Sequence, residues 1–129
     1  MDQICESRVM VVEDDQDIRD SLVEVIQDNS YDVLPASNGH EALEQLRKGD
    51  GKPCVILLDI MMPVMDGRQF RSVQREDPRL RDIPVIVLTA HAMADDTFKD
   101  LEPVAYMKKP VKLTELLGAI ARHCRPRAA

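Results

Sequence analysis

Three short runs of mostly branched apolar residues constrain the fold of this chain more than any other feature of its sequence. The runs are Val9–Val12, Val55–Leu58 and Val85–Leu88. Continuous apolar runs of this length are typical of strands buried on both faces, as in parallel sheets. Two weaker patterns, Tyr31–Pro35 and Val104–Met107, mix apolar and polar residues, and the first ends in a proline. Both features favour strands at the edges of a sheet.

Helical patterns lie between these predicted strands. Apolar residues recur at helical spacing in three segments: Ile18–Ile26, Ala42–Leu46 and Leu113–Ile120. Asn38 and Glu41 resemble a capping box, and Asp66 is expected to open a further helix. Strands that alternate with helices predict an α/β fold, a three-layer sandwich in which helices cover both faces of a five-stranded parallel sheet. Because the most apolar strands belong in the middle, we expect the order 2-1-3-4-5, which is that of the flavodoxin-like fold.

The length and composition fit one soluble domain over residues 1–129, with a core at about 8–122 and a frayed tail over 123–129. No apolar run approaches the roughly 20 residues that cross a membrane. The first residues lack the basic and apolar regions of a secretion signal, so a cytoplasmic location is expected. A formal net charge of -6 disfavours direct binding to nucleic acid.

Three further expectations concern cysteines, arginines and a loop. Free thiols are expected at all three cysteines, because they are an odd number without close spacing: Cys5, Cys54 and Cys124. A solvated helix face is expected for three arginines at helical spacing: Arg68, Arg71 and Arg75. The glycine-containing stretch Lys48–Pro53 is expected to be a loop within the domain.

Polar residues follow the predicted strands at one edge of the sheet. They are Glu13, Asp14 and Asp15 after the first strand, Asp59 after the third, Thr89 after the fourth and Lys109 after the fifth. Taken singly, such an aspartate is usually a helix cap, such a threonine a turn residue and such a lysine a solvated side chain. Together they are expected to converge, because the carboxyl ends of parallel strands share one edge. Clustered carboxylates repel one another unless a cation neutralises them, which favours Mg²⁺, with Mn²⁺ as an alternative. An ion of this kind and a lysine would suit a phosphoryl group.

These residues resemble the receiver domain of two-component response regulators, of the chemotaxis type. The resemblance runs from about Arg8 to Ile120 through VVEDDQDIR, LLDIMMPVMDG, IPVIVLTAHA and YMKKP. It implies that Asp59 accepts a phosphoryl group from a sensor histidine kinase or a histidine phosphotransfer protein. It also implies the remaining roles: Glu13 and Asp14 as metal ligands with Asp59, Met61 as a ligand through its backbone carbonyl, Lys109 as the partner of the phosphoryl group, and Thr89 and Tyr106 as the switch residues.

The resemblance further implies a protein that is not an enzyme beyond phosphorylating and slowly dephosphorylating itself. Met61 and His91 would flank the path of the attacking water, and a methionine cannot orient water, so slow loss of phosphate is expected. The output surface would comprise a helix after Thr89, the strand Val104–Met107 and the last helix. Through it the chain would control a downstream protein effector or an attached output domain.

One segment departs from the family pattern. Between Thr89 and Lys109 the chain is short and carries Glu102–Pro103 where a glycine is common, so a short or displaced helix is expected there. Two other functions stay open. One is a receiver-like interaction module that is never phosphorylated. The other is a phosphatase of the haloacid dehalogenase type, which Met61 disfavours because that position would need a general acid.

Overall fold

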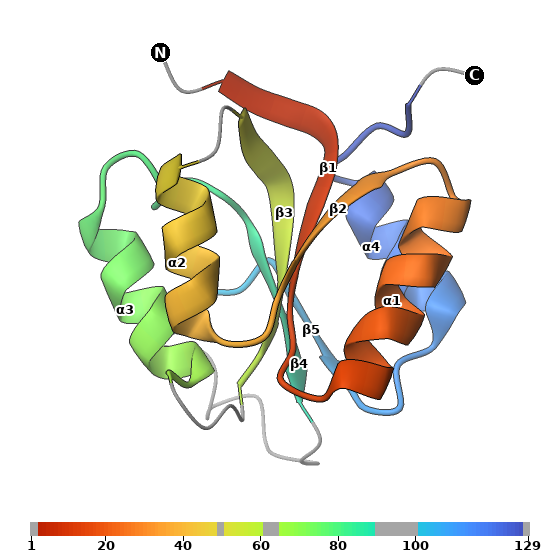
Figure 1. The fold of residues 1–129 in the computed structure, drawn as a ribbon. Coiled ribbons are helices and arrows are strands. Elements are labelled where there is room, and N and C mark those ends of the chain that lie inside the picture. Colours follow the sequence, from red (N-terminus) through yellow and green to blue (C-terminus); the bar gives the residue numbers. More distant parts are fainter. Residues whose placement is uncertain (1–2, 49–50, 61–64, 90–100, 128–129) are drawn as a thin grey trace.

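The computed structural model describes residues 3–48, 51–60, 65–89 and 101–127. Strands and helices alternate along most of these ranges (Figure 1). In chain order they are β1 (Gln3–Val12), α1 (Gln16–Asp28), β2 (Asp32–Ala36), α2 (Gly39–Lys48), β3 (Gly51–Asp59), α3 (Gly67–Glu76), β4 (Val85–Thr89), β5 (Ala105–Lys108) and α4 (Leu113–Ala121). The helix expected directly after Thr89 falls on residues 90–100, outside the described ranges.

The five strands form one parallel sheet in the order β2-β1-β3-β4-β5, which confirms the predicted topology. Helices α1 and α4 cover one face of the sheet, and α2 and α3 cover the other (Figure 1). The register aligns Val12 with Leu58 and Asp59 with Leu88, so neighbouring strands end close together. Pro35 lies in the edge strand β2, where its missing amide hydrogen disrupts less of the ladder.

The side chains of the central strands alternate between two apolar cores. Val9 and Val11 of β1 pack on the side of α1 and α4, with Leu22 and Leu116. Met10 of β1 packs on the opposite side with residues of α2 and α3, as does Val12. Because consecutive side chains of a strand point to opposite faces, an unbroken apolar run fills both cores. This explains why the apolar runs predicted the three central strands.

The amino-terminal end of the sheet is longer than expected. Strand β1 begins at Gln3 and pairs with β3 from Gly51 onward, so the predicted loop at Lys48–Pro53 is partly strand. The side chain of Lys52 is buried, and its ammonium group donates to the carbonyl oxygen of Leu46 at 2.7 Å. Gly51, Lys52 and Pro53 therefore belong to β3.

The prediction of free thiols is wrong for two of the three cysteines. Cys54 in β3 and Cys124 after α4 form a disulfide bond, with Cα atoms 5.5 Å apart, whereas Cys5 is free. Their separation of 70 residues left no local spacing to signal the bond. The packing of α4 against the sheet brings them together.

The carboxyl-terminal tail also differs from the frayed segment that we expected. The backbone amide of Arg125 donates to Glu6 of β1 at 2.8 Å, and that of Arg127 donates to Ser30 at 2.7 Å. The guanidinium of Arg127 contacts the Asp32 carboxylate at 2.6 Å. These contacts and the disulfide hold residues 122–127 against the amino-terminal end of the sheet.

Asp66 opens α3 as predicted: it is the N-cap, and its side chain accepts from the amide of Gln69 within a complete capping box. The solvated arginine face is wrong at Arg71, which is buried. Its guanidinium donates to the carbonyl oxygens of Leu101 at 2.7 Å and Glu102 at 3.2 Å. The segment before β5 covers this part of the helix, which periodicity alone could not predict. In the described part of the chain, no helix has the length and apolar character needed to span a membrane.

Candidate functional site

The site begins at the end of β1 with three consecutive acidic residues. Glu13 is buried at 1% exposure, and its amide donates to the carbonyl of Ala36, which extends the pairing of β1 with β2. One oxygen of its carboxylate accepts from the amide of Asp15 at 3.2 Å. Asp14 is exposed beside it. Asp15 caps α1 by accepting from the amide of Ile18 at 3.1 Å, so it has the structural role expected of a strand-end aspartate.

Strands β3 and β4 bring two further candidates to the same edge of the sheet. Asp59 is the last residue of β3 and is buried at 3% exposure, and Thr89 is the buried last residue of β4. The amide of Lys109 donates to the carbonyl of Thr89 at 2.7 Å, which ties the lysine to the end of β4. The parallel sheet therefore gathers residues that are far apart in sequence.

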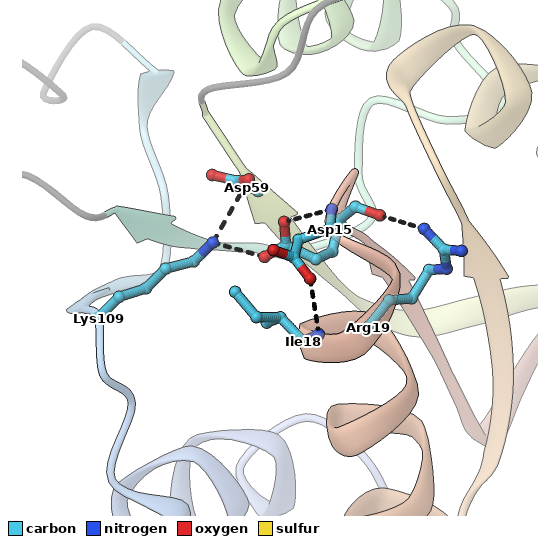
Figure 2. A network of polar contacts seen from close by, with 6 residues as sticks. Asp15, Ile18, Arg19, Asp59 and Lys109 are labelled. Atoms are coloured by element: carbon cyan, nitrogen blue, oxygen red, sulfur yellow. Dashed lines mark hydrogen bonds and ion pairs between the residues drawn. The ribbon is translucent and has the colours of Figure 1, made fainter.

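Lys109 is the positive charge between the acidic residues. Its Nζ lies 2.5 Å from Oε1 of Glu13 and 3.4 Å from Oδ2 of Asp59 (Figure 2). Burial lowers the pKa of this ammonium group, but the hydrogen bond to Glu13 and the charges of Asp59 and Glu13 outweigh it and raise the pKa above its usual value. Lys109 is therefore charged at neutral pH and stabilises the two buried carboxylates.

The carboxylates of Glu13, Asp14 and Asp59 can hold a metal ion. Each offers one oxygen, and these oxygens lie within 4.8 Å of one another. An all-oxygen set with an exposed member suits Mg²⁺ or Mn²⁺, which keep several water ligands. The backbone ligand predicted at Met61 lies outside the described residues, as does His91. The donor set of the described residues fits a hard divalent cation.

The two predicted switch residues lie in different environments. The side chain of Thr89 is buried at the edge of the site, whereas Tyr106 of β5 is 44% exposed. Thr89 in β4 and Tyr106 in β5 lie on neighbouring strands, which are aligned so that Thr89 pairs with Lys108.

A groove of about 380 Å³ lies beside the site, between α1 and the segment that follows Lys109. Its lining is mainly apolar and includes Ile18 and Leu22 from α1 and Pro110, Val111 and Leu113 from the other wall. Ile18 and Leu113 are both partly exposed to solvent. Lys109 lines the groove and also contacts the acidic residues of the site, so the groove lies next to the site.

Sequence reasoning missed the contact of one basic residue with the site. Nη1 of Arg19 in α1 donates to the backbone carbonyl of Glu13 at 2.8 Å. The available signal was charge, since Arg19 is the only basic residue between Glu13 and Asp28.

Comparison with known proteins identifies the family. The model of the response regulator receiver domain matches residues 9–121. The chain belongs to this family. The receiver domain is 36% identical over 128 residues to the response regulator MprA of Mycobacterium leprae, a match that covers 92% of this chain and 53% of that protein. It is 35% identical over 126 residues to the phosphate regulon transcriptional regulatory protein PhoB of Klebsiella pneumoniae, with 94% of this chain and 54% of that protein covered. The chain thus spans about half the length of either regulator.

Solved structures agree with this assignment. The chemotaxis protein CheY4 of Vibrio cholerae superposes with a TM-score of 0.82 at 28% identity, covering 92% of this receiver domain and 99% of that chain. The response regulator Rcp1, whose structure holds Mn²⁺, superposes with a TM-score of 0.71 at 27% identity, covering 88% of each chain. The flavodoxin-like fold expected from the sequence is that of the CheY4 structure.

Proposed function

We propose that this receiver domain accepts a phosphoryl group on Asp59 and thereby changes its affinity for a partner protein. The observation that carries the proposal is the position of Lys109, whose ammonium group contacts both Asp59 and Glu13 at the carboxyl edge of the sheet. Donors of the expected kind are sensor histidine kinases and histidine phosphotransfer proteins. The partner is a protein effector or an output domain in the same chain, because a net charge of -6 disfavours direct contact with nucleic acid.

The proposed chemistry is a direct transfer between nucleophiles. An oxygen of the Asp59 carboxylate attacks phosphorus, the P–N bond of a donor phosphohistidine breaks, and its electrons stay on the imidazole ring. Lys109 releases its contact with Asp59 and pairs with a phosphoryl oxygen. Glu13, Asp14, Asp59 and the backbone of Met61 would hold Mg²⁺, which when bound neutralises the acidic cluster and polarises the phosphoryl oxygens.

The acyl phosphate would act through added charge and new acceptor oxygens. The hydroxyl of Thr89 would donate to one of these oxygens and Tyr106 would turn inward. This would shift the equilibrium between two conformations of the surface that includes β5 and α4. The activity would be limited to self-modification, with slow loss of phosphate because Met61 cannot orient water. A half-life of seconds in Mg²⁺ would contradict that last point.

The groove beside α1 supports a docking role in the same reaction. Its apolar lining, with Ile18 and Leu22, suits a helix of the phosphodonor protein, and it ends at Lys109. A donor helix seated there would bring its phosphohistidine toward Asp59. We place this exchange in the cytoplasm, where phosphorylated histidine donors of this class act.

The test is phosphorylation by acetyl phosphate in Mg²⁺, read by intact mass. Wild type and the control Asp20→Asn, an exposed aspartate of α1, should gain one phosphoryl group, whereas Asp59→Asn should gain none. Chelation of Mg²⁺ should prevent the gain. An unmodified wild type in both acetyl phosphate and a phosphohistidine donor would overturn the proposal and leave the receiver-like interaction module.

A further inference from the structure

Arg19 contacts the backbone of Glu13, one of the candidate metal ligands. Its Nη1 donates to the backbone carbonyl of Glu13 at 2.8 Å (Figure 2). The amide of Glu13 donates to the carbonyl of Ala36 at 3.0 Å. The carboxylate of the same residue accepts from Lys109 and from the amide of Asp15. Glu13 is therefore held at its amide, its carbonyl and both carboxylate oxygens, and Arg19 supplies the contact to the carbonyl from a side chain of α1.

Arg19 lies at the start of the second turn after the Asp15 cap, next to the turn that carries two of the three candidate metal ligands. Its hydrogen bond to the Glu13 carbonyl joins the side of α1 to that turn.

We infer that Arg19 is a positioning residue of the metal site, which acts by fixing the Glu13–Asp15 turn so that the carboxylates of Glu13 and Asp14 face the ion. This inference rests on the proposed function of the acidic cluster. Among the described residues, the guanidinium forms no hydrogen bond or ion pair with the three carboxylates, so its effect passes through the backbone of Glu13.

The sign of the effect distinguishes positioning from simple charge. A positive charge near the cluster repels a divalent cation, so an effect of charge alone predicts tighter binding when Arg19 is removed. Loss of positioning predicts weaker binding, because ligands that are not held in place must be ordered at the expense of affinity. Arg19 bonds the Glu13 carbonyl directly and Asp15 caps α1 at the other end of the turn, so we expect positioning to dominate.

The experiment measures the dissociation constant for Mn²⁺ alone, from the paramagnetic resonance signal of the free ion. For Arg19→Leu we expect a dissociation constant higher by about tenfold, at the low end of the range for residues that orient metal ligands. Arg19→Lys keeps the charge without the planar donor and should fall between Arg19→Leu and wild type. Arg81→Leu removes the same charge from an exposed position between α3 and β4 and should bind Mn²⁺ as wild type does.

Urea unfolding without metal separates positioning from stability. A variant that loses stability but keeps the wild-type dissociation constant shows that Arg19 is merely structural, and this overturns the inference. Binding by Arg19→Leu that is equal to or tighter than wild type also overturns it. If Arg19→Leu does not fold, Arg19→Lys decides by the same criterion. Failure of wild type to bind Mn²⁺ would overturn the metal site itself, and with it this inference, whereas normal binding with unchanged variants rejects the role of Arg19 alone.

Discussion

At the scale of single residues, Lys109 is the positive charge that compensates two acidic side chains at the carboxyl edge of the sheet. Two buried carboxylates, Glu13 and Asp59, lie within reach of its ammonium group. Without that charge much of the free-energy cost of removing the two carboxylates from water would lose its compensation. We expect Lys109→Gln to lower the free energy of unfolding by about 2–3 kcal/mol at neutral pH in chelator. The control Lys108→Gln changes an exposed neighbour and should have little effect.

The pH dependence of this difference follows from the raised pKa of Lys109. Burial lowers this pKa, but Glu13 and Asp59 raise it by more than burial lowers it. The folded state therefore holds the proton more tightly than the unfolded state does. Its stabilising contribution is complete below the unfolded pKa of about 10.4 and is lost as pH rises through the folded pKa.

Urea unfolding measures this dependence as the difference between wild type and Lys109→Gln. The difference should be constant from about pH 7 to about 9 and should shrink above about 10.4. Both proteins should carry Cys5→Ser, since a free thiolate at high pH would exchange with the disulfide. A difference that grows with pH in this window would contradict the assignment.

At the scale of elements, the close approach of the start of α3 to the end of β3 depends on the absence of a side chain at Gly67. A Cβ there would lie 2.8 Å from Cα of Ile60 and 3.2 Å from the carbonyl oxygen of Asp59, both backbone atoms that cannot move aside cheaply. We expect Gly67→Ala to destabilise the fold by about 1–3 kcal/mol and to slow phosphorylation of Asp59.

Gly118→Ala is the matched control, because a Cβ there meets nothing within 4 Å. In the middle of α4 it should stabilise by about 0.5–1 kcal/mol. Thermal unfolding of both variants, with opposite shifts expected, tests the argument.

Arg71 connects α3 to the segment that enters β5. Its guanidinium donates to the carbonyls of Leu101 and Glu102 and to the side chain of Gln74. Burial lowers the pKa of this group, and the charge of Arg75 lowers it further, yet three acceptors hold the guanidinium in place. Arg71→Met should lower the free energy of unfolding by about 2–4 kcal/mol, because it leaves buried acceptors without donors.

Arg75 provides the comparison for Arg71 on the same helix. It forms an ion pair with Glu102 at 3.0 Å, but both side chains are exposed. Such a pair contributes about 0–1 kcal/mol, so Arg75→Met should change urea unfolding little. Equal losses for the two variants would show that burial of Arg71 does not decide its contribution.

At the scale of the whole molecule, the sequence predicted the parts of the fold that depend on local pattern. The apolar runs that form β1, β3 and β4 must be central, so their carboxyl ends had to bring Glu13, Asp14 and Asp59 together. The path of the segments between elements was not predictable in this way. The burial of Arg71 depends on how residues 101–102 cross α3, and helical periodicity does not specify which neighbour covers a face.

The disulfide escaped prediction for a similar physical reason. Its cysteines are 70 residues apart, and only the docking of α4 on the sheet places them together. The bond lies at the amino-terminal half of β3, whereas Asp59 ends the same strand at the opposite edge of the sheet. The molecule therefore separates a covalently tied end of the sheet from the end that carries the candidate metal site.

This separation predicts that reduction affects stability but not phosphorylation. Opening a cross-link between residues this far apart should lower the free energy of unfolding by about 2–4 kcal/mol, since the unfolded chain regains conformational freedom. Urea unfolding of wild type with and without reductant measures the loss, and Cys5→Ser should respond to reductant as wild type does. The double variant Cys54→Ala/Cys124→Ala should resemble the reduced protein and should not respond to reductant.

The rate of labelling by acetyl phosphate should be the same for oxidised and reduced protein, because the tail contacts Glu6, Ser30 and Asp32 rather than the acidic cluster. A labelling rate that changes with reduction would mean that the two ends of the sheet are coupled.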